Sequence, residues 1–247
     1  MSDPFEPYYV GVYWGIREET VETCAARASA MFNHLAECDP IFQRWFMLGR
    51  SRKEALKHEV KTDVKTMQAL LLKGRNRTDF GRQVIPELGF SFYAWNGGED
   101  DQDGVGINFV CGCYAHRVAN YCLIRLPSGE YSRERVMRIP VLIDIMKRMV
   151  TIWEADWGVV NSSNYTDIAP RKSPKAPIIS WITYLSEDRG ILPPLPAPVR
   201  VEGVEGHGTI ITLTEDRFTI NNPAHLENAA RVTAILDQAR LLEPFLK

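Results

Sequence analysis

The chain has 247 residues, of which 45% are hydrophobic and 24% charged, and its formal net charge is −2. This composition is typical of a globular protein that buries its core without disulfides or metals. A charge so close to zero gives no general attraction to nucleic acid or membranes, and no run of about 18 apolar residues predicts a transmembrane helix. The acidic start of the chain lacks the apolar core of a signal peptide, so we expect a cytoplasmic protein with reduced cysteines.

The first half of the chain predicts a strand, then helices, then a run of three strands. Tyr8–Trp14 is β-branched and aromatic, which is typical of a strand. Thr20 is expected to cap a helix that runs to about Cys38, and Thr62 is expected to cap a second helix that ends at Gly74. Three strands separated by turn residues follow, which predicts an antiparallel meander: 89–95, 105–114 and 120–126.

The second half predicts a helix, more strands and a final helix. Pro140 suits the first turn of a helix that carries Trp153, and Asn222-Pro223 suits the start of the last helix. The strands expected between these helices are 157–160, 178–185, 199–204 and 209–213. The fold class is therefore α+β, with one or more antiparallel sheets and helices packed on one face. We expect a single domain over residues 1–247; the long polar loop 161–177 leaves open a break between two subdomains.

No catalytic signature is present, and the best cluster for chemistry is Cys111, Cys113 and His116. Residues at alternate strand positions share a face, so the two thiols could converge. Structural zinc sites need four ligands and favour a wider cysteine spacing, whereas free cysteine commonly packs as a small hydrophobe. The sequence therefore favours buried cysteines and predicts no metal site, no cofactor and no catalytic residue.

The charge distribution is uneven although the total is small. Gln83 to His116 contains no Lys or Arg, whereas the preceding segment, Arg50 to Arg82, contains ten. Most charge runs are simply solvated surface, and that interpretation stays open here. The sharpest site prediction is that an acidic turn and the tryptophan beside it bind a basic partner. The residues of this predicted site are Trp95, Glu99, Asp100, Asp101 and Asp103.

Several aromatic and proline-containing stretches carry a family resemblance. They are Tyr8–Gly15, Trp153–Gly158, Ser180–Ser186, the proline string 192–198 and Asn221–Glu227. Together they resemble the immunity protein 52 family of bacterial polymorphic toxin systems, whose members are α+β proteins that bind and neutralise nuclease toxins, typically of the restriction-endonuclease-like class. The family's Gly-Trp motif corresponds to Ser180-Trp181, with Ser in place of Gly. These motifs are structural, so the resemblance transfers no binding residues.

The resemblance implies a protein that acts through its surface. The partner is then a cognate nuclease toxin, such as one delivered by a type VI secretion system, with no direct role for nucleic acid or membranes. Two alternatives stay open. One is an enzyme of unrecognised type that uses Cys111, Cys113 and His116, and the other is an adaptor or scaffold that uses the proline string 192–198 or the basic helical region.

Overall fold

The computed structural model describes residues 5–116, 118–173 and 175–244, and its framework is one eight-stranded sheet. The strand order is β2-β3-β4-β1-β5-β6-β8-β7, and every neighbouring pair is antiparallel. The strands are β1 (Tyr8–Trp14), β2 (Phe90–Trp95), β3 (Gly106–Cys111), β4 (Asn120–Arg125), β5 (Trp157–Ser162), β6 (Ile182–Ser186), β7 (Arg200–Val204) and β8 (Gly208–Thr212). The predicted meander of three strands is confirmed as β2-β3-β4.

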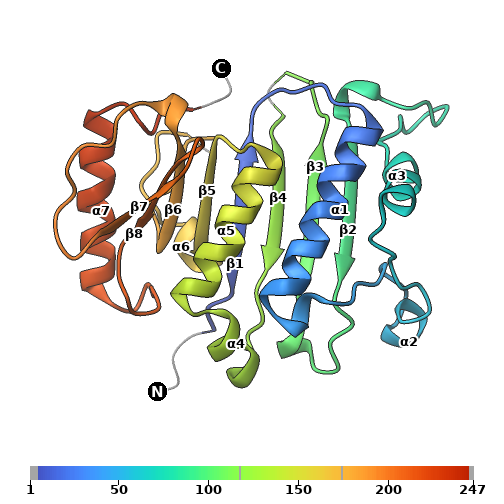
Figure 1. Cartoon of the computed structure of the whole chain (residues 1–247), viewed down its shortest axis with the longest axis horizontal. Coiled ribbons are helices and arrows are strands. Elements are labelled where there is room, and N and C mark those ends of the chain that lie inside the picture. Colours follow the sequence, from blue (N-terminus) through green and yellow to red (C-terminus); the bar gives the residue numbers. More distant parts are fainter. Residues whose placement is uncertain (1–4, 117, 174, 245–247) are drawn as a thin grey trace.

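Two long helices, α1 (Val21–Cys38) and α5 (Ile139–Trp153), lie side by side across one face of the sheet (Figure 1). α3 (Val64–Lys73) packs on α1 beside the β2 edge, and α7 (Pro223–Gln238) lies at the opposite end, beside β7 and β8. The short helices are α2 (Arg52–Ala55), α4 (Glu130–Val136) and α6 (Ser163–Thr166). The predicted α+β class with helices packed on the sheet is confirmed. No helix within the described residues is long and apolar enough to cross a membrane.

Most helix ends follow the capping residues expected from the sequence. Thr20 accepts a hydrogen bond from the backbone N–H of Thr23, and Asn222 caps α7 with proline following it. The predicted cap of α3 was wrong by one residue. Asp63, not Thr62, is the N-cap, because its carboxylate accepts from the backbone N–H of Thr66 at 3.0 Å.

The segment 161–177 is more ordered than the sequence predicted. Its first two residues complete β5, and α6 follows directly. The next predicted strand begins late, because residues 178–181 lie outside β6. There the Ser180 hydroxyl donates to the side-chain oxygen of Asn161 in β5. The strands before and after this segment belong to the same sheet, while the division of the chain into domains stays a prediction.

The core lies between the sheet and the α1–α5 pair. Trp14 of β1 stacks on Trp153 of α5, with ring centroids 5.1 Å apart, and Phe109 of β3 lies 5.3 Å from the same ring. All described tryptophans except Trp95 are buried, so most of them are core residues.

A partly buried ion pair joins the end of α4 to the end of α1. Both Asp39 carboxylate oxygens accept from the Arg135 guanidinium, at 2.6 and 2.8 Å, and one also accepts from the backbone N–H of Ile41. Burial alone would raise the pKa of Asp39, but the hydrogen bonds from Arg135 and Ile41 outweigh it and hold the pKa below its usual value. The ionised carboxylate is therefore the form that stabilises the fold.

We predict that Asp39→Asn lowers the free energy of unfolding by about 2 kcal/mol at pH 7. Because the folded pKa lies below the unfolded one, this contribution is present above the unfolded pKa and is lost as the pH falls through the folded pKa. Urea unfolding from pH 7 to pH 3 should show the two proteins converging in stability at acid pH. Glu59→Gln is the control, because its pair with Arg44 is largely exposed and should matter far less. A difference that does not change with pH would contradict the prediction.

Candidate partner-binding surface

The sheet has one face that the helices cover and one that is partly open. In β2, β3 and β4, Phe92, Phe109 and Cys122 form a buried row against the helices. The next row, formed by Tyr93, Asn108 and Leu123, points to the other side and is partly exposed. β5 and the first four residues of β6 are buried on both faces instead. The uncovered face therefore lies on β2, β3, β4 and β1, while β7 at the opposite edge of the sheet is exposed as an edge strand.

We call this exposed half the open face. Its side chains are mostly aromatic and aliphatic, and all are partly exposed: Tyr9, Tyr13, Tyr93, Trp95, Val110, Tyr121 and Leu123. Aromatic rings supply large contact areas with little loss of side-chain entropy, and tyrosine and tryptophan are enriched where proteins bind each other. The open face thus has the composition of an interface.

Two glycines keep the open face flat. A Cβ at Gly11 would lie 2.5 Å from Leu123 Cδ2 and 3.0 Å from the Tyr13 hydroxyl. A Cβ at Gly106 would lie 3.1 Å from the Tyr93 hydroxyl. These side chains lie across the glycines, and Tyr13 also stacks on Trp157 with ring centroids 4.3 Å apart. The rings are therefore held in place before any partner arrives, which lowers the entropy lost on binding.

Two grooves run into the open face and share Asn108. The larger has a volume of about 770 Å³, with Tyr9, Leu123 and Arg125 among the residues that line it. The smaller, of about 460 Å³, lies towards the β2 edge, where Met47 and Lys73 border it. Asp101 and Gly104 also line the larger groove, so the acidic turn adjoins this surface.

The protein scaffold holds the acidic turn from both sides. The Arg52 guanidinium donates to the carbonyls of Gly97 and Gly98, at 3.1 and 3.0 Å. The backbone N–H groups of Ser128 and Gly129 donate to the Gln102 carbonyl, at 2.7 and 2.8 Å. These bonds use backbone oxygens of the turn. Of its side chains, Asp100 accepts from the backbone N–H of Gln102 and Asp103 accepts from the Ser132 hydroxyl, whereas Glu99 and Asp101 make no hydrogen bond with the described residues.

Among the described residues, no helix or strand covers the open face. The same residues include no group of three or more His, Cys, Asp or Glu side chains able to hold a metal. The family model for immunity protein 52 matches residues 6–245. The chain belongs to the immunity protein 52 family. Membership implies a toxin as the partner of this chain.

A solved structure supports the fold of this immunity protein 52 family member. The Pseudomonas aeruginosa T6SS protein PA0821 superposes with a TM-score of 0.59 over 96% of this chain and 77% of that one. The two sequences are 10% identical, so the likeness concerns the fold alone. A comparison with curated proteins finds no match.

The predicted site residues of this family member do not share one environment. Glu99, Asp100 and Asp101 are exposed, and no Lys or Arg of the described residues lies within ion-pair distance of them. Asp103 is partly buried and accepts from the Ser132 hydroxyl of α4, which ties it to the scaffold. Trp95 lies on the open face, but its indole N–H is buried without a partner among the described residues. Their role in binding stays a prediction.

The cysteine cluster is not assembled as a reactive site. Cys111 and Cys113 are buried, whereas His116 is exposed. A hydrogen bond with Cys24, together with burial, raises the pKa of the Cys111 thiol well above its usual value, and burial raises that of Cys113. Raised pKa values keep both thiols protonated and unreactive at neutral pH.

The sequence interpretation missed the tyrosines of the open face, because it based the predicted site on the acidic run and on Trp95. A usable signal was present. In β2 and β4, aromatic or aliphatic residues occupy both alternating rows, so one row had to lie away from the helices unless a second layer covered it. The extent of that second layer depends on tertiary structure, and no local sequence pattern indicates it.

We predict that neighbouring residues of β2 differ sharply in their effect on stability. Phe92→Ala should lower the free energy of unfolding by about 3 kcal/mol, because it opens a cavity beneath the helices. Tyr93→Ala should cost less than half of that, because its ring lies on the open face and is already partly hydrated. Urea unfolding of both variants measures the difference. Equal losses would show that the open face is part of the core.

Proposed function

We propose that this chain is an immunity protein that binds and neutralises a cognate nuclease toxin by stoichiometric contact, without catalysis, in the cytoplasm of the producing cell. The observation that carries the proposal is the open face, an aromatic surface held flat by the fold, with unpaired carboxylates at its rim. Family membership supplies the class of partner, and the charge of the rim supports a nuclease within that class.

A nuclease is a suitable partner for electrostatic reasons. It needs a basic surface to follow the phosphate backbone of its substrate. The exposed carboxylates of Glu99, Asp100 and Asp101 would face that surface with opposite charge, which speeds encounter and fixes orientation. The aromatic side chains of the open face would then supply the area that leaves water on binding. An interface of this kind, on the order of 1,600 Å² in total, is adequate for tight binding.

The two alternative functions find less support. The enzyme hypothesis rested on Cys111, Cys113 and His116, of which only the last is exposed. The adaptor hypothesis rested on the proline string, but Leu192 and Leu195 within it pack against the core. That packing favours a stiff connector leading into β7 over a free ligand for another protein. The basic segment also contributes Arg52 to the support of the acidic turn.

We predict that reversing the charge of Glu99, Asp100 and Asp101 to Lys slows association with the toxin by about tenfold at low salt. Asp103 is left unchanged because it bonds to Ser132. The toxin to test is the product of a toxin gene adjacent to the gene for this chain. Stopped-flow association at several salt concentrations should show a steep salt dependence for the wild-type protein and a flatter one for the variant.

The matched control reverses Glu187, Asp188 and Glu227, which are exposed at the β6–α7 end of the molecule. It should associate at the wild-type rate. If both triple variants behave like the wild type, the acidic turn is only solvated surface, although the proposed function survives. If the wild-type chain neither binds the neighbouring effector nor rescues cells that express it, the proposed function itself fails.

A further inference from the structure

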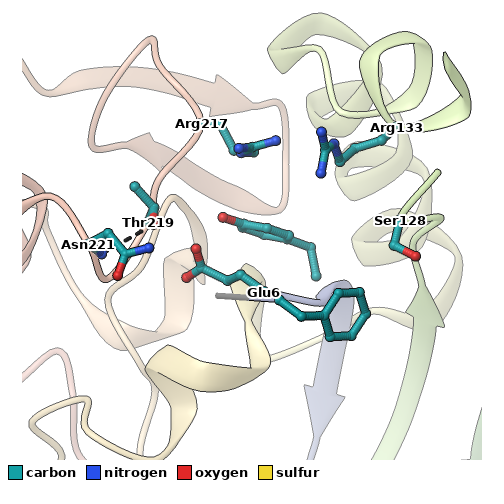
Figure 2. Close-up of a pocket in the computed structure, with 8 residues that line it drawn as sticks. Glu6, Ser128, Arg133, Arg217, Thr219 and Asn221 are labelled. Atoms are coloured by element: carbon teal, nitrogen blue, oxygen red, sulfur yellow. Dashed lines mark hydrogen bonds between the residues drawn. The ribbon is translucent and has the colours of Figure 1, made fainter. Parts of the chain in front are cut away.

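A separate cavity, of about 250 Å³, adjoins the larger groove of the open face. Phe5, Tyr8 and Ser128 line both. The cavity lies where β1 begins, between α4 and the segment that joins β8 to α7 (Figure 2). Its walls contain Arg133, Arg217 and Glu6.

The two arginines carry more positive charge than their surroundings balance. Figure 2 shows their guanidinium groups pointing toward each other from opposite sides of the cavity, with Glu6 below them. Among the described residues, neither arginine has a carboxylate within 4.0 Å, and Arg133 Nε is buried without a hydrogen-bond partner. Two like charges that converge on one space repel each other, and a buried unsatisfied donor is costly. An anion between the two guanidinium groups would relieve their repulsion.

The remaining wall supplies neutral donors. Thr219 contributes a hydroxyl group and Asn221 a side-chain amide, and neither donates a hydrogen bond to the described residues. The Ser128 hydroxyl, by contrast, donates to the Gln102 carbonyl at 3.4 Å. The floor is also polar, since the Tyr8 hydroxyl donates to the Phe218 carbonyl. Donors on several sides suit a group with oxygens in several directions, whereas a planar carboxylate would need only one guanidinium fork.

Charge balance favours the same class of ligand. Two guanidiniums and one carboxylate leave an excess of about one positive charge, and a phosphate group carries about one and a half to two negative charges at neutral pH. We propose that this cavity binds a phosphate-type oxyanion, either inorganic phosphate or the phosphate of a monoester. The ligand contacts Arg133 and Arg217 from opposite sides, and any organic part of a monoester extends past Ser128 into the adjoining groove.

The test measures thermal unfolding of the full chain with inorganic phosphate. At about 10 mM phosphate we expect the Tm to rise by about 3 °C over sodium chloride of equal ionic strength, because a ligand of the folded state stabilises it. Arg217→Gln should abolish the rise, and this exposed residue can be replaced without disturbing the core. Arg133→Gln should do the same. Arg50→Gln, which removes an exposed arginine outside the cavity, should keep the full rise.

Two further arms decide the chemistry. If adenosine monophosphate raises the Tm more than inorganic phosphate does, the site binds phosphate monoesters. If its rise is equal or smaller, the site binds free phosphate. An equal rise with acetate would overturn the proposal in favour of a carboxylate site. A phosphate effect no greater than that of chloride, or one that survives in Arg217→Gln, would show that the cavity binds no such anion. These outcomes do not depend on the toxin, so they leave the proposed function untouched.

Discussion

The structure depends on unequal cover of one sheet. Eight strands present two faces, and the two long helices α1 and α5 cover one of them. On the other face, α6 and the segment that follows it supply buried residues such as Tyr165, Ile178 and Ile179. That cover ends near β5, which is why β5 is buried on both faces while β2, β3 and β4 alternate. The open face is the part of the sheet for which the described chain supplies no second layer.

This asymmetry separates two tasks within the same strands. Side chains that face the helices, such as Phe92 and Phe109, hold the fold together through stacked aromatic contacts with each other. Their neighbours on the open face contribute less burial and are free to serve a partner. The acidic turn, the larger groove and the arginine cavity adjoin one another at one end of that surface. A single partner placed there would meet negative charge, aromatic area and positive charge in succession.

Much of the fold could be predicted from local patterns. Thr20 and Asn222 mark helix starts because their side chains cap the backbone, and the β2-β3-β4 meander follows from consecutive strand-like runs separated by turn residues. The position of β1 between β4 and β5 could not be predicted this way, because it depends on pairing between residues far apart in sequence. The start of β6 at Ile182 also depends on contacts between distant segments, since the Ser180 side chain just before it bonds to Asn161 of β5.

The candidate site divides in the same way. Its acidic turn was visible as a stretch without basic residues, because charge is a property of composition. The scaffold role of Asp103 was not visible, since it requires Ser132 from a distant helix. Arg133 and Arg217 are 84 positions apart in sequence, and no motif connects them. Only the fold brings them to one cavity.

The central place of β1 has a consequence for synthesis of the chain. Trp14 pairs with Asn120, and Tyr8 pairs with Ser162. Both edges of this early strand therefore pair with segments that are synthesised much later. Because a ribosome adds about 5 to 20 residues per second, that strand has no partners for several seconds. An apolar strand with two unsatisfied edges is a template for association with other chains. The nascent protein is therefore a natural client for ribosome-associated chaperones until residue 162 has emerged.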